Sequence, residues 1–74
     1  MNKIHIRIDT QTDVIEFVNT ANTIDEEVFL EDGTHFRASA KSLLGVMYGM
    51  SEFKELIVLS EYDNLSSKFS KFLK

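Results

Sequence analysis

The sequence predicts an α+β fold in which a four-stranded antiparallel sheet carries three helices on one face and leaves the other face polar. Three observations favour it. Polar and apolar residues alternate over residues 3–8, apolar residues then recur at helical spacing, and an Asp-Gly pair at 32–33 divides the next apolar stretch. The chain has 74 residues, of which 43% are hydrophobic and 27% are charged. This length and composition predict a single domain over residues 1–74 with one dense core.

The first two elements are a strand and a capped helix. Residues 3–8 alternate between polar side chains and isoleucines, which gives a strand one buried face and one polar face. Thr10 and Asp13 have the spacing of a capping box, in which both side chains bind free amides at a helix start. The helix is expected at about 12–22, where four apolar residues share one face: Val14, Phe17, Val18 and Ala21.

The middle of the chain predicts a hairpin followed by a short helix. The Asp-Gly pair at 32–33 suits a tight turn because glycine readily adopts a positive φ. Strands are therefore expected over 28–30 and 34–36. Residues 39–50 are rich in helix formers, and the helix is expected to start near residue 39 or 40, with Gly49 just beyond its end.

The last part of the chain predicts a central strand and a final helix. Residues 54–60 include a continuous run of branched apolar side chains at 56–59, typical of a strand buried on both faces. Asp63 or Asn64 is expected to cap a helix with four apolar residues on one face: Leu65, Phe69, Phe72 and Leu73. The element order is thus βαββαβα. Periodicity leaves the strand order open between a ferredoxin-like sheet and an open-faced sandwich.

Composition excludes several classes of function. The chain has no cysteine, and its two histidines, His5 and His35, have no close-spaced partner ligand, so both are interpreted as surface residues and no metal or cofactor is expected. A net charge of -4 argues against binding to nucleic acid. No apolar stretch is long enough to cross a membrane, and we expect a cytoplasmic protein. No pair of groups suggests acid–base catalysis or a small-molecule substrate, so we do not expect an enzyme.

Two motifs carry a resemblance to a known family. The run AKSLLGVM at 40–47 is similar to the start of the second helix of the HPr family, the phosphocarrier proteins of the bacterial sugar phosphotransferase system. The run FVNTA at 17–21 resembles the family's first-helix motif. The resemblance covers nearly the whole chain, agrees with the βαββαβα order, and implies the HPr-like open-faced β-sandwich.

The resemblance does not extend to the phosphocarrier site. In the family, a histidine just before the first helix accepts phosphate from a phosphoenolpyruvate-dependent enzyme. Counting back from the first-helix motif places Thr10 at that histidine, Thr12 at the family's arginine and Asp13 at its proline. A phosphothreonine is a stable ester, unlike a labile phosphoramidate, so Thr10 is not expected to relay phosphate. The alternative interpretation of Thr10 and Asp13 is a helix cap alone.

The resemblance does retain a regulatory serine. Ser42 matches the residue that an ATP-dependent kinase phosphorylates in many members, and a phosphate there would meet free amides at a helix start, with Lys41 adding a charge contact. The phosphoserine form of the family docks on a catabolite control repressor, and Leu43, Leu44 and Met47 match part of the contact surface. The alternatives are that Ser42 only caps the helix and that some of the three apolar residues belong to the core.

Three hypotheses follow. The first is a non-catalytic regulatory or interaction module, similar to the Crh type of the family, whose partners are the serine kinase and the catabolite control repressor. The second is a structural or assembly domain that keeps only the fold and binds an unrelated partner through the open sheet face or the second helix. The third is a residual phosphoacceptor that uses His5 or another group, and it predicts a phosphohistidine after treatment with phosphoenolpyruvate and the first enzyme of the system.

Overall fold

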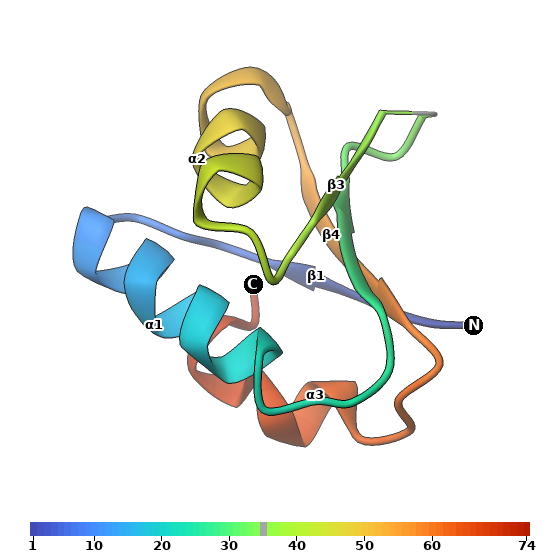
Figure 1. Ribbon diagram of the computed structural model, residues 1–74. Coiled ribbons are helices and arrows are strands. Elements are labelled where there is room, and N and C mark those ends of the chain that lie inside the picture. The colour runs from blue at the N-terminus through green and yellow to red at the C-terminus, as the bar shows by residue number, and fades with distance from the viewer. Residues whose placement is uncertain (35) are drawn as a thin grey trace.

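A four-stranded antiparallel sheet forms one layer of the computed structural model, which describes residues 1–34 and 36–74 (Figure 1). The elements follow in the order β1 (Asn2–Ile6), α1 (Gln11–Ala21), β2 (Val28–Glu31), β3 (Arg37–Ser39), α2 (Leu43–Glu52), β4 (Leu56–Ser60), α3 (Leu65–Lys68) and the 3-10 helix η1 (Ser70–Phe72). The strand order is β1-β4-β2-β3, and all neighbours are antiparallel. The expected α+β class and βαββαβα order are confirmed, and β4 is the central strand between β1 and β2.

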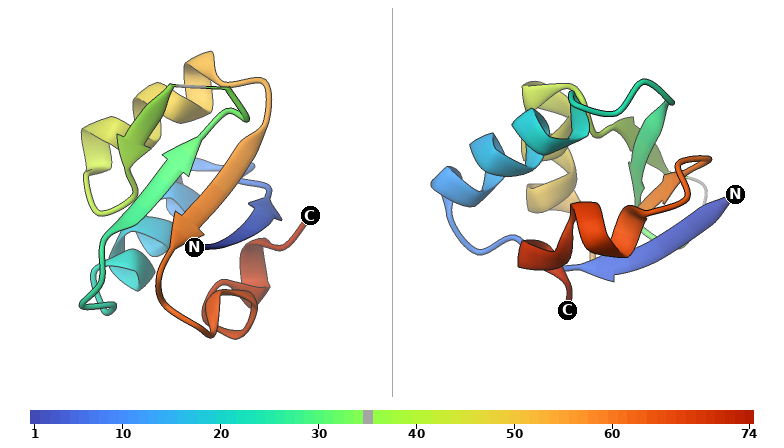
Figure 2. Two further views of the ribbon diagram at one scale, coloured as in Figure 1. Left: turned by 90° about the vertical axis from the view of Figure 1, so that its right-hand side faces the viewer. Right: turned by 90° about the horizontal axis from the view of Figure 1, so that it is seen from below.

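The helices form a second layer on one face of this sheet (Figure 2). The core between the layers contains the buried face of α1, which consists of the four residues expected from the sequence: Val14, Phe17, Val18 and Ala21. Phe17 is fully buried, and its ring centroid lies 5.1 Å from that of Phe69 and 5.5 Å from that of Phe72. These three aromatic rings join α1 to the C-terminal segment.

The N-terminus of α1 has the expected capping box. Thr10 Oγ1 accepts a hydrogen bond from the amide of Asp13 at 3.1 Å, and Asp13 Oδ2 accepts one from the amide of Thr10 at 3.3 Å. The helix begins at Gln11, one residue earlier than expected, because the cap residue lies outside the helix.

The helix-free face of the sheet is less polar than the sequence suggested. Ile57 and Leu59 lie on this face, opposite the core residue Val58, and are only 4% and 8% exposed. Leu59 is flanked by Lys3 and Phe29 on the neighbouring strands. The face therefore has an apolar centre with little exposure to solvent.

Arg37 packs against neighbouring side chains of β2. Its guanidinium carbon lies 4.9 Å from the ring centroid of Phe29, and its Nη2 lies 3.3 Å from Glu31 Oε2. Both partners come from β2, the strand that pairs with β3. Arg37 thus combines a cation–π contact with an ion pair across two strands.

The third strand starts later than the expected 34–36: β3 begins at Arg37, and Thr34 and Phe36 lie outside it. Gly33 has the positive φ expected of it, 88°. Asp32 Oδ1 also accepts hydrogen bonds from the amide and the hydroxyl of Thr34, at 2.9 and 2.6 Å. Such side-chain bonds are typical of an Asx turn, and the pairing of β2 with β3 starts at Glu31 and Arg37. His35, interpreted above as a surface residue, lies outside the described residues.

The second helix starts later than the sequence suggested. Ser39 belongs to β3 and pairs with Phe29, so α2 begins only at Leu43, with Ser42 as its N-cap. The expectation that Gly49 lies beyond the helix was wrong, because Gly49 is a buried residue within α2.

The C-terminal segment is less regular than expected. In place of one longer helix it forms α3, of four residues, and then η1. Leu65, Phe69 and Phe72 are buried as expected, but Leu73 is 44% exposed and forms an isolated backbone bridge with Ile6. The backbone therefore turns toward the edge of β1 before Leu73 can join the apolar face. None of the helices described is long and apolar enough to cross a membrane.

Candidate functional site

Ser42 lies exposed at the start of α2, where it caps the helix. Its backbone is extended, with φ -102° and ψ 121°, and its Oγ accepts a hydrogen bond from the amide of Gly45 at 3.1 Å. A Cβ atom on Gly45 would lie 3.0 Å from the Ser39 carbonyl oxygen and 3.4 Å from Ser42 Oγ. Glycine at this position therefore leaves room for the serine side chain to approach the first turn of the helix.

Lys41 joins the start of α2 to the end of α1. Its ammonium donates a hydrogen bond to the Ile24 carbonyl oxygen, and its own carbonyl accepts one from Asn22 Nδ2 at 3.1 Å. Asn22 is the C-cap residue of α1, and its Nδ2 also donates to the Val18 carbonyl at 2.9 Å. The ammonium is thus occupied by the backbone, and its contact with a phosphate on Ser42 stays a prediction.

The three apolar residues expected at the contact surface all have exposed side chains. Leu44 is 79% exposed, and Leu43 and Met47 are each exposed by more than two fifths, at 46% and 43%. The buried positions of α2 are instead Val46 and Gly49. None of the three residues is therefore part of the core.

Two further large apolar side chains are exposed, Ile15 of α1 and Tyr48 of α2. The sequence alone did not single them out. Tyr48 follows Leu44 by one helical turn, so the helical period predicts that the two side chains share one face of α2. Ile15 lies outside the buried face of α1, and no sequence pattern relates it to α2. We call the exposed set on α1 and α2 the apolar patch: Ile15, Leu43, Leu44, Met47 and Tyr48.

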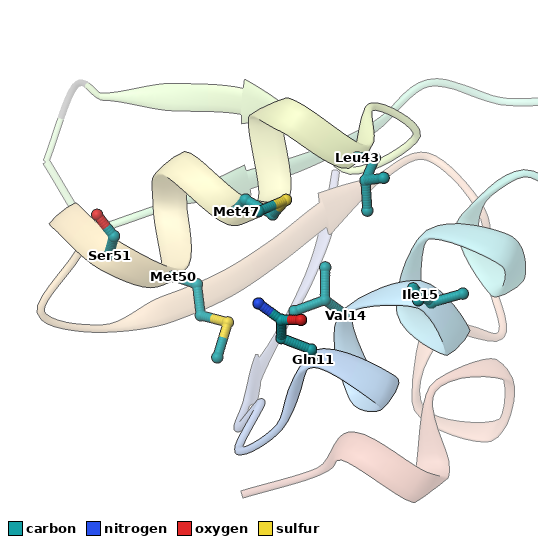
Figure 3. Close-up of a pocket in the computed structure, with 7 residues that line it drawn as sticks. All are labelled: Gln11, Val14, Ile15, Leu43, Met47, Met50 and Ser51. Atoms are coloured by element: carbon teal, nitrogen blue, oxygen red, sulfur yellow. The ribbon is translucent and has the colours of Figure 1, made fainter.

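A groove of about 370 Å³ lies between α1 and α2 and adjoins this patch (Figure 3). Seven residues line it: Gln11, Val14, Ile15, Leu43, Met47, Met50 and Ser51. Figure 3 shows Gln11 and Val14 of α1 facing Met47 and Met50 of α2. None of these lining residues is charged, so the groove suits apolar side chains, and the two methionines can adapt their shape.

Thr10 and Ser42 do not line the groove, but each immediately precedes a residue that does, Gln11 and Leu43 respectively. The Thr10 hydroxyl accepts the Asp13 amide, and the Asp13 carboxylate accepts the amides of Asp9 and Thr10 at 3.2 and 3.3 Å. These groups make a helix cap. Over the described part of the chain, no cluster of three or more His, Asp or Glu side chains is arranged to hold a metal ion.

The comparison with solved structures identifies the architecture. The crystal structure described as HPr-C-His from Thermoanaerobacter tengcongensis matches with a TM-score of 0.69 and 22% sequence identity, over 95% of this chain and 84% of that chain. The chain has the HPr fold. No protein-family model and no curated protein matches the sequence. At 22% identity the likeness establishes the fold alone.

Proposed function

We propose that this HPr-fold protein is a non-catalytic regulatory and interaction module of the sugar phosphotransferase system, controlled by phosphorylation of Ser42. The observation that carries the proposal is the exposed N-cap serine at the start of the helix that presents the apolar patch. A single modification at Ser42 would change the charge at the edge of that patch. The expected partners are a serine kinase and a catabolite control repressor, and the expected location is the cytoplasm.

The chemistry of Thr10 supports a protein without phosphorelay activity. Its hydroxyl already accepts the Asp13 amide within the helix cap. A phosphoryl group on threonine would form a stable ester that does not transfer readily to an acceptor. The neighbouring Asp13 carboxylate would also repel an incoming phosphate dianion. We therefore propose that the protein has no enzymatic or phosphocarrier activity, metal or cofactor of its own.

The geometry of Ser42 supports a modifiable residue. Its Oγ would attack the γ-phosphorus of ATP, ADP would leave, and the hydroxyl proton would pass to a base of the kinase. The product places a dianion at the N-terminus of a ten-residue helix, where free amides and the helix dipole favour it by about 0.3–1 kcal/mol per charge. Gly45 adds no side chain that would crowd the phosphate.

The test is phosphorylation by the purified serine kinase of the system with ATP. We expect a mass gain of one phosphoryl group, located on Ser42 by fragmentation. The Ser42→Ala variant should show none, whereas the matched Ser51→Ala variant, on the exposed face of the same helix, should be modified normally. Failure to modify the wild-type chain would remove the regulatory proposal.

A parallel incubation tests the absence of phosphorelay. Phosphoenolpyruvate and the first enzyme of the system should add no acid-labile phosphoryl group to the chain. A phosphohistidine on His5 would instead support the residual phosphoacceptor hypothesis.

The alternative function is a structural or assembly domain, and the extent of the apolar patch favours it as the second candidate. Ile15 and Tyr48 lie outside the residues matched to the repressor contact, so the patch could bind a partner without any phosphate. The sheet face is the weaker surface because Ile57 and Leu59 are buried. The two functions differ in how they expect the purified repressor to bind. Binding that requires phosphate on Ser42 supports the regulatory function, and the absence of phosphate-dependent binding supports the assembly role.

A further inference from the structure

Lys41 is held by three hydrogen bonds that fix the peptide just before Ser42. Its amide donates to Ser39 Oγ at 3.2 Å, its carbonyl accepts from Asn22 Nδ2 at 3.1 Å, and its ammonium donates to the Ile24 carbonyl. Ile24 is only 2% exposed, so its carbonyl has little access to water. The lysine side chain therefore fastens the turn that follows α1 to the start of α2.

The same ammonium belongs to the residue that immediately precedes Ser42. Consecutive Cα atoms lie about 3.8 Å apart, and lysine has a long flexible stem that ends in three donors. Ser42 Oγ points to the amide of Gly45, and an attached phosphate would extend outward from this first helical turn. An ammonium binds a phosphate dianion more strongly than it binds a neutral carbonyl, because both partners are then charged.

We propose that phosphorylation of Ser42 moves the Lys41 ammonium from the Ile24 carbonyl to the phosphate, and that this loosens the turn at the end of α1. The inference rests on the proposed phosphorylation of Ser42 and states its conformational consequence. Lys41 is in this view a positioning residue inside the molecule before modification and a phosphate ligand after it.

Three backbone amides report on the turn. Those of Asn22, Thr23 and Ile24 donate to the carbonyls of the last turn of α1 at 3.0, 3.1 and 3.2 Å. A turn that has lost the Lys41 contact opens more often, so hydrogen exchange at these amides becomes faster. Amides of the central strand β4 exchange by wider opening of the fold and serve as the internal reference.

The experiment installs phosphoserine at position 42 during translation, so that its outcome does not depend on any kinase. Hydrogen exchange is measured by NMR on the unmodified and phosphorylated chains, each with Lys41 and with Lys41→Met. We expect phosphorylation to accelerate exchange at the three amides at least about threefold relative to β4. Lys41→Met should accelerate them similarly without phosphate, and phosphorylation of that variant should add nothing.

A second readout needs only the native lysine. The carbonyl carbon resonance of Ile24 should move on phosphorylation in the direction of a lost hydrogen bond, even where Lys41→Met folds poorly. Lys68→Met, which removes an exposed lysine of α3, is the matched control and should leave both readouts unchanged.

Two outcomes would overturn the inference. One is no change at Ile24 and the three amides on phosphorylation; the other is that phosphorylation accelerates exchange in Lys41→Met as much as in the native chain. Either result leaves the proposed function intact, because the kinase assay tests it separately. Conversely, a kinase that ignores Ser42 would remove the proposed function without altering the response of the installed phosphoserine.

Discussion

Gly49 of α2 lies directly against Leu30 of β2: a Cβ atom built on the glycine would stand 2.9 Å from Leu30 Cδ2. The same atom would lie 3.0 Å from two ring atoms of Phe53, the C-cap residue of the helix. Leu30 is fully buried, and because protein interiors are close-packed it cannot shift without displacing its neighbours. The absence of a side chain at Gly49 therefore sets how closely the helix that carries the apolar patch approaches the sheet.

Gly49→Ala tests this packing. Alanine should favour the helix by up to about 1 kcal/mol, but overpacking against Leu30 and Phe53 should destabilise the protein by about 1–3 kcal/mol. We therefore expect a net loss in the free energy of unfolding of about 1 kcal/mol in urea. Ser51→Ala, on the exposed side of α2, is the control and should change stability by less than about 0.5 kcal/mol. A more stable Gly49→Ala protein would show that the contact does not limit the approach.

Thr10→Ala tests the helix cap at the position of the family's histidine. It removes the acceptor of the Asp13 amide and should lower the free energy of unfolding by about 1 kcal/mol. Thr12→Ala, an exposed threonine of the same helix, should have an effect below about 0.5 kcal/mol. Equal losses for the two variants, measured in urea, would argue against a capping role for Thr10.

Phe17→Leu tests the aromatic cluster that joins α1 to the C-terminal segment. The variant loses ring contacts with Phe69 and Phe72 and leaves a partial cavity, so we expect a loss of about 1–3 kcal/mol. Leu44→Ala removes more of a side chain but at an exposed position, and should alter stability by less than about 0.5 kcal/mol. The thermal midpoints of the two variants should therefore separate clearly, and similar midpoints would contradict the assignment of Phe17 to the core.

Leu44→Ala also tests the apolar patch as a binding surface. If the repressor or another partner docks there, loss of this side chain should weaken binding about tenfold or more while the fold is unchanged. Leu73→Ala removes an exposed leucine outside the patch and should leave the affinity unaltered. Calorimetry on the Ser42-phosphorylated protein gives the comparison, and equal affinities for wild type and Leu44→Ala would place the binding surface elsewhere.

Arg37→Ala tests the packing of Arg37 against β2. Arg37 contacts the Phe29 ring and Glu31, so its loss should destabilise the protein by about 0.5–1.5 kcal/mol. Arg7→Ala, whose side chain is 71% exposed in its pair with Asp9, should have an effect below about 0.5 kcal/mol. Urea unfolding of both variants checks the difference, and an equal loss for Arg7→Ala would show that the stacked position of Arg37 adds nothing.

The candidate site could be predicted only as far as it is contiguous in the chain. Ser42, Leu43, Leu44 and Met47 occur in one short run, so a sequence motif contains them all. The groove beside them also needs Val14 and Ile15, which α1 contributes only because the two helices pack together. The bond between Lys41 and Ile24 joins residues seventeen positions apart and has no local sequence signal.

The sequence alone determined the order of the elements, the capping box of α1 and the buried positions of that helix: Val14, Phe17, Val18 and Ala21. It could do so because each of these features depends on neighbours within one or two helical turns. Long-range contacts decided the rest. Pairing of Ser39 with Phe29 sets where α2 can begin, close packing on Leu30 holds Gly49 inside that helix, and the strand order buries Ile57 and Leu59 on the face without helices. No local pattern encodes these outcomes, since each requires segments distant in sequence to meet first.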